Sequence, residues 1–138
     1  MTKKEYLQSV APQVASIIFE QIVTETPANV VASWAIHGVG AGTVSVNNVD
    51  MACLTLHVDA LIHKGVVCVA YDDGADTYHV ALYSKDKCRV SPWRDDVYFN
   101  ELGTLIDQLI ERPVDMSDED YEILADADTF AKTGLHLY

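Results

Sequence analysis

The 138-residue chain has the length of one domain, and a hydrophobic content of 49% is enough to bury a core, which excludes global disorder. Its net charge of −12 disfavours DNA or RNA as a partner, because the phosphates would be repelled. The sequence shows neither a secretion signal nor an apolar run near the roughly 20 residues of a membrane span. We therefore expect a single domain, residues 1–138, in the cytoplasm and without a membrane partner.

The N-terminal segment has the pattern of an amphipathic helix. Pro12 lies inside this pattern and predicts a kink or a fresh start, because proline cannot complete the helical hydrogen bonds. The segment 24–27 predicts the end of the helix, since the residue before Pro27 avoids the α region. The apolar residues recur at steps of three and four and should face a core; they are Leu7, Val10, Ala11, Val14, Ile17, Ile18 and Ile22.

From Asn29 the period changes to two, which predicts strands. Stretches rich in turn-forming residues separate the alternating segments, so neighbouring strands are expected to pair in an antiparallel meander. The strands predicted in this way cover residues 29–37, 43–47, 51–61, 66–72 and 77–84.

Three glycines, Gly38, Gly40 and Gly42, follow the first predicted strand. A dinucleotide-binding loop needs a third glycine where Thr43 stands and a helix directly after it, whereas the next residues look like a strand. We therefore expect a hairpin loop, in which the glycines supply positive φ angles.

After Pro92 the pattern is helical again. Asp95 and Asp96 are expected in the first turn, where they favour the helix dipole, and Ser117 should begin a last helix. The fold class is thus predicted as α+β: an antiparallel meander of about five strands, with N-terminal and C-terminal helices packed on one face. The apolar stripe of the first of these C-terminal helices is Tyr98, Leu102, Leu105, Ile106, Leu109 and Ile110.

Two turns set the predicted strand register. If they centre on residues 63–64 and 74–75, His57, Ala70 and His79 share one row on the face away from the helices. Asp59 and Asp72 lie one step away on either side, so the two imidazoles and one of these carboxylates form a candidate zinc site, for which we select Asp59. The alternative is two half-exposed histidines that share no ion.

The same face carries many apolar residues, too many for free exposure on a monomer. A second copy of the chain, a partner or one of the chain's own helices is expected to cover it. The three cysteines form no C-x-x-C pair and are expected to be reduced thiols. The apolar residues concerned are Met51, Cys53, Leu61, Val66, Cys68, Ala70, Ala81 and Tyr83.

Charge is distributed unevenly along the chain. Residues 95–138 hold 12 acids and 2 bases, whereas residues 1–94 hold 9 acids and 7 bases. Such a surface either only keeps the protein dissolved or attracts a basic protein partner. The acids that we select for partner binding are Asp118, Glu119, Asp120 and Glu122.

A small basic patch surrounds Trp93 and includes Arg94. Trp and Arg are favoured at the centres of protein interfaces, so both join the predicted partner-binding residues. The alternative is a solvated connector in which Trp93 packs into the core.

The sequence contains no catalytic or cofactor-binding motif that we can name. The leading hypothesis is therefore a small acidic protein-binding module of adaptor, chaperone or immunity type, without enzymatic activity or cofactor. We expect a homodimer and a partner with a basic surface. The competing hypotheses are a metal-dependent enzyme or metal-binding protein that uses His57 and His79, and an acidic mimic of nucleic acid.

Overall fold

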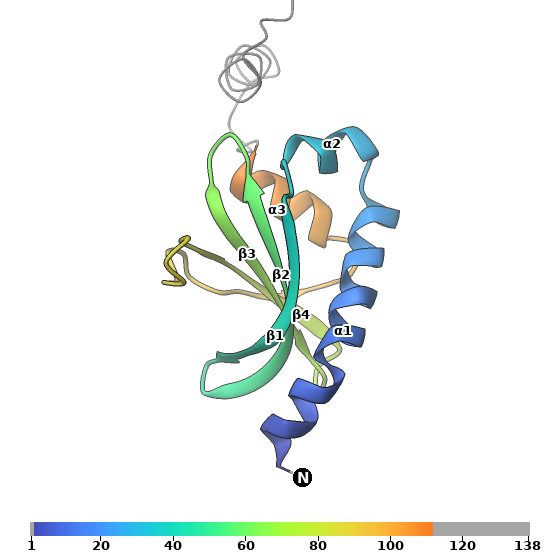
Figure 1. The fold of residues 1–138 in the computed structure, drawn as a ribbon. Helices are drawn as coiled ribbons and strands as arrows, with labels where there is room; N and C mark the ends of the chain where they lie inside the picture. The colour runs from blue at the N-terminus through green and yellow to red at the C-terminus, as the bar shows by residue number, and fades with distance from the viewer. Residues whose placement is uncertain (1, 112–138) are drawn as a thin grey trace, which may run out of the picture.

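The computed structural model describes residues 2–111. A single antiparallel sheet in the order β1-β2-β3-β4-β5 carries α1 and α3 on one face, as Figure 1 shows, so the predicted α+β class is confirmed. The predicted helix from Ser117 lies outside the described residues. The elements are α1 (Lys3–Glu25), α2 (Ala28–Ser33), β1 (Gly38–Val46), β2 (Val49–Asp59), β3 (Lys64–Asp72), β4 (Thr77–Tyr83), β5 (Arg94–Val97) and α3 (Leu102–Ile110).

The long helix α1 begins at a capped end and continues through its proline. The Thr2 hydroxyl oxygen accepts a hydrogen bond from the Glu5 amide at 3.1 Å, which satisfies one of the free donors of the first turn. Pro12 lies inside the helix rather than at a break between two helices. The predicted end before Pro27 is confirmed, with Thr26 as the C-cap in extended conformation.

The main core lies between the sheet and the two helices, on what we call the helix face. Alternate residues of β2, β3 and β4 point into it, which confirms the apolar face predicted from the period of two. The helices contribute one stripe each. The fully buried members with the largest side chains include Ile18, Ile22, Leu54, Leu56, Val67, Val69, Leu102, Ile106 and Ile110.

The first predicted strand, residues 29–37, is wrong, because its first half is the short helix α2. Pro27 precedes this helix with φ −55°, a value already suited to a helix start. Val30 and Trp34 are four residues apart, which fits one helical turn as well as one face of a strand, and the core decides between the two. Trp34 is fully buried, and its indole N–H donates to Asp107 Oδ1 of α3 at 2.9 Å.

The glycine stretch is not a hairpin loop but the first half of β1. Gly38, Gly40 and Gly42 recur with the period of a strand, and they pair with alternate residues of β2. The turn between β1 and β2 lies at Asn47 and Asn48 instead, where both residues have positive φ as a two-residue hairpin turn requires.

The fifth strand, β5, occupies the segment that we predicted as the start of a helix. Asp95 and Asp96 therefore lie in a strand paired with β4, and α3 begins only at Leu102. The pairing is irregular, and Asp96 has a φ of 56°. The sheet reaches five strands because this extra strand replaces the one lost to α2.

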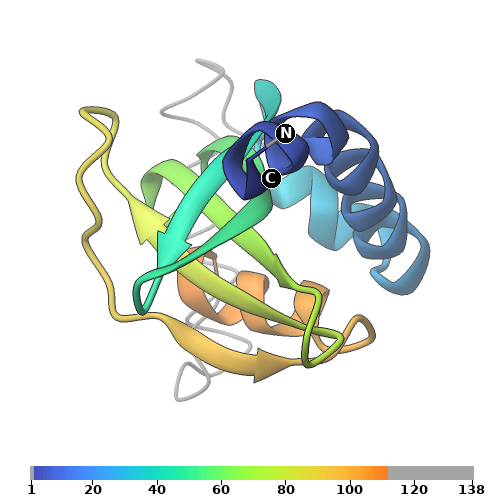
Figure 2. The ribbon, with the colours of Figure 1, turned by 90° about the horizontal axis from the view of Figure 1, so that it is seen from below.

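The opposite face of the sheet, which we call the open face, is partly covered by the chain itself. Figure 2 shows the connector between β4 and β5, residues 84–93, on the side of the sheet away from α1. Trp93 of this connector packs against a second apolar cluster, so the covering element is a connector rather than one of the expected helices. The buried residues of this cluster are Val46, Met51, Cys53, Cys68 and Ala70.

The close approach of α3 to the end of α1 depends on Gly103. A Cβ atom there would overlap the Thr26 hydroxyl oxygen. We predict that Gly103→Ala lowers the free energy of unfolding by about 2 kcal/mol through overpacking, although alanine raises intrinsic helix propensity by about 1 kcal/mol. Urea denaturation followed by circular dichroism measures this change.

The Thr26→Ala background provides the control. It removes the Thr26 hydroxyl oxygen and methyl group, which obstruct the added Cβ atom, and keeps only Thr26 Cβ. There the cost of Gly103→Ala should fall below about 1 kcal/mol. A Gly103→Ala variant more stable than the wild type would contradict this packing.

Candidate functional site

The candidate zinc ligands His57 and His79 do not share a row. The predicted register of β3 and β4 is confirmed, with Ala70 opposite His79. The predicted register of β2 and β3 is wrong, because Leu56 pairs with Val67 and His57 with Val66. The offset is four residues, an even number, so every side chain keeps its predicted face while its cross-strand neighbour changes.

The third candidate ligand, Asp59, is engaged elsewhere. Its carboxylate lies 3.0 Å from the Lys64 ammonium group across the β2–β3 pair. His57 is exposed, and its ring centroid lies 6.1 Å from that of His37. Within residues 2–111 no group of three or more His, Cys, Asp or Glu side chains is placed to hold a metal ion. The structure therefore separates the residues that we predicted as zinc ligands.

His79 instead bridges two carboxylates on the open face. Its Nδ1 lies 2.7 Å from Asp95 Oδ1 on β5, and its Nε2 lies 3.1 Å from Asp72 Oδ2 on β3. Its side chain is only 8% exposed. Burial alone would lower the pKa of His79, but the hydrogen bonds to Asp72 and Asp95 outweigh it and raise the pKa. The His79 hydrogen bond in turn lowers the pKa of Asp72.

This arrangement gives His79 a structural role. When the imidazolium donates both N–H groups to carboxylates, neither nitrogen is left for proton transfer or metal binding. The cluster joins β5 to the β3–β4 hairpin across three strands. Sequence reasoning placed Asp72 one step from His79 but missed the bridge to β5, because Asp95 was assigned to a helix.

The two predicted partner-binding residues in the described chain lie at the end of the connector. Trp93 is half-buried, and its ring centroid lies 6.3 Å from that of Tyr83, so it helps to cover the open face. Arg94 is exposed at the beginning of β5. The predicted acids Asp118, Glu119, Asp120 and Glu122 lie outside the described residues.

A groove that the sequence did not reveal runs along α1. It consists of two hollows, of about 190 and 310 Å³, that share Ile17 and Gln21. We call them together the α1 groove. The residues that line it are Val14, Ile17, Ile18, Glu20, Gln21, Thr24, Glu25, Tyr71, Asp76, Tyr78 and Phe99.

The α1 groove has an apolar centre. Ile17 was predicted as part of the buried stripe, but it is 49% exposed, and Phe99 from the loop after β5 is equally exposed. The Tyr78 hydroxyl donates to Gln21 Oε1, so this aromatic wall is fixed against α1.

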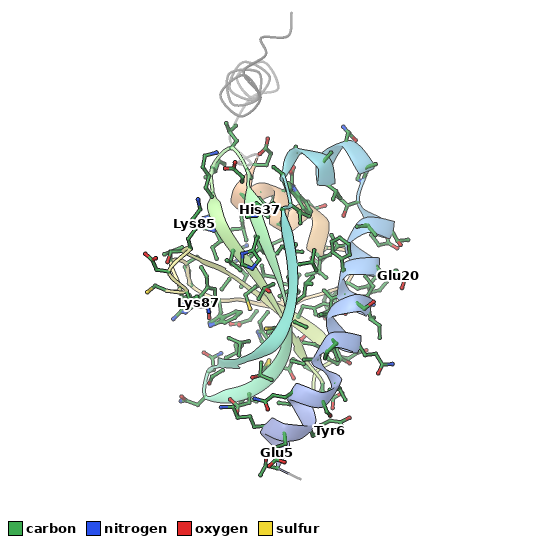
Figure 3. All side chains as sticks on the ribbon, viewed as in Figure 1. Glu5, Tyr6, Glu20, His37, Lys85 and Lys87 are labelled. Carbon is green, nitrogen blue, oxygen red and sulfur yellow. The ribbon has the colours of Figure 1, made fainter. Side chains whose placement is uncertain are left out.

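Carboxylates rim the same groove. Glu20, Glu25 and Asp76 line it, and the lining includes no lysine or arginine. The Tyr71 hydroxyl donates to Asp76 Oδ1 at 2.8 Å, and this bond raises the pKa of Tyr71 to about 12. Figure 3 shows Glu20 on the outer side of α1, whereas Lys85 and Lys87 lie on the opposite side of the molecule. These two lysines therefore lie away from the rim of the α1 groove.

Comparison of the chain with protein-family models, curated proteins and solved structures finds no match. Among the helices of residues 2–111, none combines the length and the apolar character that crossing a bilayer requires.

The His79 cluster makes stability depend on pH. The pKa of His79 is raised in the folded state, so protonated His79 stabilises the fold fully at pH values below the ordinary histidine pKa of about 6.5. This stabilisation is lost as the pH rises through the raised folded-state pKa. The lowered pKa of Asp72 means that its contribution disappears as pH falls through the acid range. We predict that His79→Gln lowers the free energy of unfolding by about 1 kcal/mol at about pH 5 and by much less at about pH 9.

Urea denaturation of wild type and variant at both pH values measures the effect. Asp96→Asn is the matched control, because it changes a neighbouring charge on β5 that forms neither a hydrogen bond nor an ion pair with His79. A cost of His79→Gln that stays constant across this range would show that the ion pairs contribute nothing.

Proposed function

We propose that the chain is a protein-binding module that holds a basic segment of a partner protein in the α1 groove. The observation that supports this function is the combination of half-exposed apolar side chains with a rim of carboxylates that has no basic residue in its lining. An apolar side chain of the partner would occupy the space beside Ile17 and Phe99. Lysine or arginine side chains of the same segment would meet Glu20, Glu25 and Asp76.

The two parts of the groove have different energetic roles. Apolar contacts at the centre of an interface supply most of the affinity, because they are removed from water on binding. Exposed carboxylates at the rim add little affinity but raise the association rate and reject acidic partners. The module is therefore suited to select its partner by charge and to retain it by apolar contact.

Charge also argues against two other occupants of this groove. A second copy of the chain carries the same net charge of −12 and would present another acidic groove. Nucleic acid would be repelled in the same way. The homodimer, the cytoplasmic location and the role of Asp118, Glu119, Asp120 and Glu122 stay predictions, and the homodimer would need a different surface.

The test uses the full-length chain and a synthetic amphipathic peptide of leucine and lysine. We predict saturable binding with amide NMR shifts centred on Ile17, Gln21 and Phe99. Ile17→Gln should weaken binding about tenfold because it removes the apolar contact while leaving the charge unchanged. Raising the salt concentration should also weaken binding, since it screens the rim carboxylates.

Val23→Gln is the matched control, because Val23 lies on the same helix, is 42% exposed and does not line the groove. A second control is a peptide of leucine and glutamate, which should not bind. The proposal fails if Ile17→Gln and Val23→Gln weaken binding equally, or if the acidic peptide binds as well. Competition by duplex DNA for a basic protein captured through this groove would instead favour the nucleic-acid mimic.

A further inference from the structure

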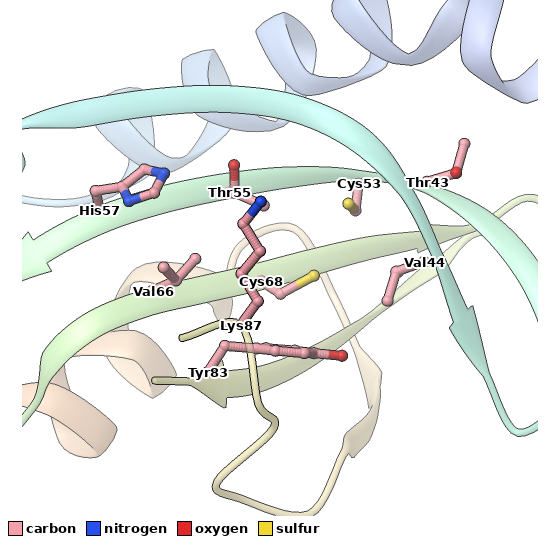
Figure 4. Close-up of a pocket in the computed structure, with 9 residues that line it drawn as sticks. All are labelled: Thr43, Val44, Cys53, Thr55, His57, Val66, Cys68, Tyr83 and Lys87. Carbon is pink, nitrogen blue, oxygen red and sulfur yellow. The ribbon is translucent and has the colours of Figure 1, made fainter. Parts of the chain in front are cut away.

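Another hollow lies on the open face, away from the α1 groove, and has the size of a small-molecule site. Its volume is about 380 Å³, within the range of roughly 300–1,000 Å³ typical of ligand pockets. Figure 4 shows that its lining side chains come from β1, β2, β3 and β4 and from the connector. We call it the open-face hollow.

The glycines of β1 explain why this face is hollow. Gly38, Gly40 and Gly42 pair with His57, Thr55 and Cys53, so all three positions share the open face. A Cβ atom at Gly40 would lie 2.6 Å from Thr55 Oγ1, whereas one at Gly42 would meet no atom within 4 Å. The period of two therefore leaves the part of β1 opposite His57, Thr55 and Cys53 without side chains on the open face, and β1 lines the hollow only with Thr43 and Val44.

The floor of the hollow is apolar, and its Cys68 thiol is neutral. Cys53 and Cys68 are buried there, and their side chains contact each other across the β2–β3 pair. This contact and burial raise the pKa of Cys68, which therefore stays a neutral thiol. The ring of Tyr83 forms an aromatic wall that Trp93 supports from the connector.

Polar groups with hydrogen-bonding capacity converge on this floor from the rim. Thr55 and His57 line the hollow from β2, and Lys87 extends over it from the connector toward β2 (Figure 4). No carboxylate lines the hollow, and Lys87 forms no ion pair with any residue in the range 2–111. A single cation over an apolar floor contrasts with the acidic character of the chain.

We propose that the open-face hollow binds a small molecule with an apolar body and one carboxylate. The carboxylate pairs with the Lys87 ammonium group and accepts hydrogen bonds from Thr55 and His57. The apolar body lies over the two thiols and against Tyr83. This ligand site is separate from the α1 groove in place and in charge, so either site can exist without the other.

The probe is 2-naphthoate, with 2-naphthamide as its neutral analogue and inorganic phosphate as an anion without an apolar body. Each is titrated into the isotope-labelled full chain and followed by NMR. We expect 2-naphthoate to bind saturably, with shifts at Cys53, Thr55, Cys68 and Tyr83. The amide should bind about fivefold more weakly because it lacks the charge that pairs with Lys87, and phosphate should give no saturable shifts at these residues.

Two variants separate the charge from the cavity. Lys87→Gln should weaken 2-naphthoate about fivefold and leave 2-naphthamide unchanged. Lys85→Gln is the matched control on the same connector, because Lys85 does not line the hollow. Gly42→Val should abolish binding of both naphthalene compounds in a folded protein, since Gly42 pairs with Cys53 of the floor, adjoins the lining residues Thr43 and Val44, and has no atom within 4 Å of an added Cβ.

The proposal is overturned if 2-naphthoate gives no saturable shifts in the open-face hollow, or if its shifts centre on Ile17 and Phe99. It is also overturned if Lys85→Gln and Lys87→Gln weaken binding equally. A Gly42→Val variant that keeps the wild-type circular dichroism spectrum and still binds 2-naphthoate would show that the cavity is not the site.

Discussion

The end of α3 holds the turn between β2 and β3, and most of the structure depends on this contact. The amides of Ile62 and His63 both donate to the Ile110 carbonyl, at 2.8 and 3.3 Å. The Leu61 amide donates to the Glu111 carboxylate at 2.7 Å. The first two bonds satisfy the Ile110 carbonyl, which the end of the helix would otherwise leave without a partner. Together the three bonds fix the residues at which the chain reverses between β2 and β3.

The position of this turn sets the register of the two central strands. With the reversal at residues 60–63, Cys53 lies opposite Ala70 and one step from Cys68, while His57 lies opposite Val66 and away from His79. The same register therefore creates the floor of the open-face hollow and removes the candidate zinc site. Helices then cover one face of the sheet, and the connector covers only part of the other. The open-face hollow follows from this unequal coverage.

Local patterns predicted the parts of the fold that depend on near neighbours. Most of the stripe of α1 and the faces of β2, β3 and β4 follow from periodicity. The β2–β3 register could not be predicted in this way, because an offset of four residues keeps every side chain on its face. What decides it is the contact with Ile110, which is distant in sequence.

The remaining errors have the same physical origin. Val30 and Trp34 satisfy both helical and strand spacing, and only burial against α3 selects the helix. Asp95 was placed at a helix start because its neighbours are acidic, whereas pairing with β4 and the bond to His79 hold it in β5. The period of α1 places Ile17 in the buried stripe. Its actual exposure depends on the positions of Phe99 and of the β3–β4 hairpin, which lie beside it in the groove.

The three glycines of β1 also have a consequence for motion. Glycine loses more backbone entropy on folding than any other residue, at about 0.5–1 kcal/mol relative to alanine in a strand. Three glycines in an edge strand place β1 among the segments that separate from the sheet at the lowest free energy. We therefore expect the residues that leave room for a ligand to provide its entrance as well, through transient fraying of β1 while β2, β3 and β4 stay paired.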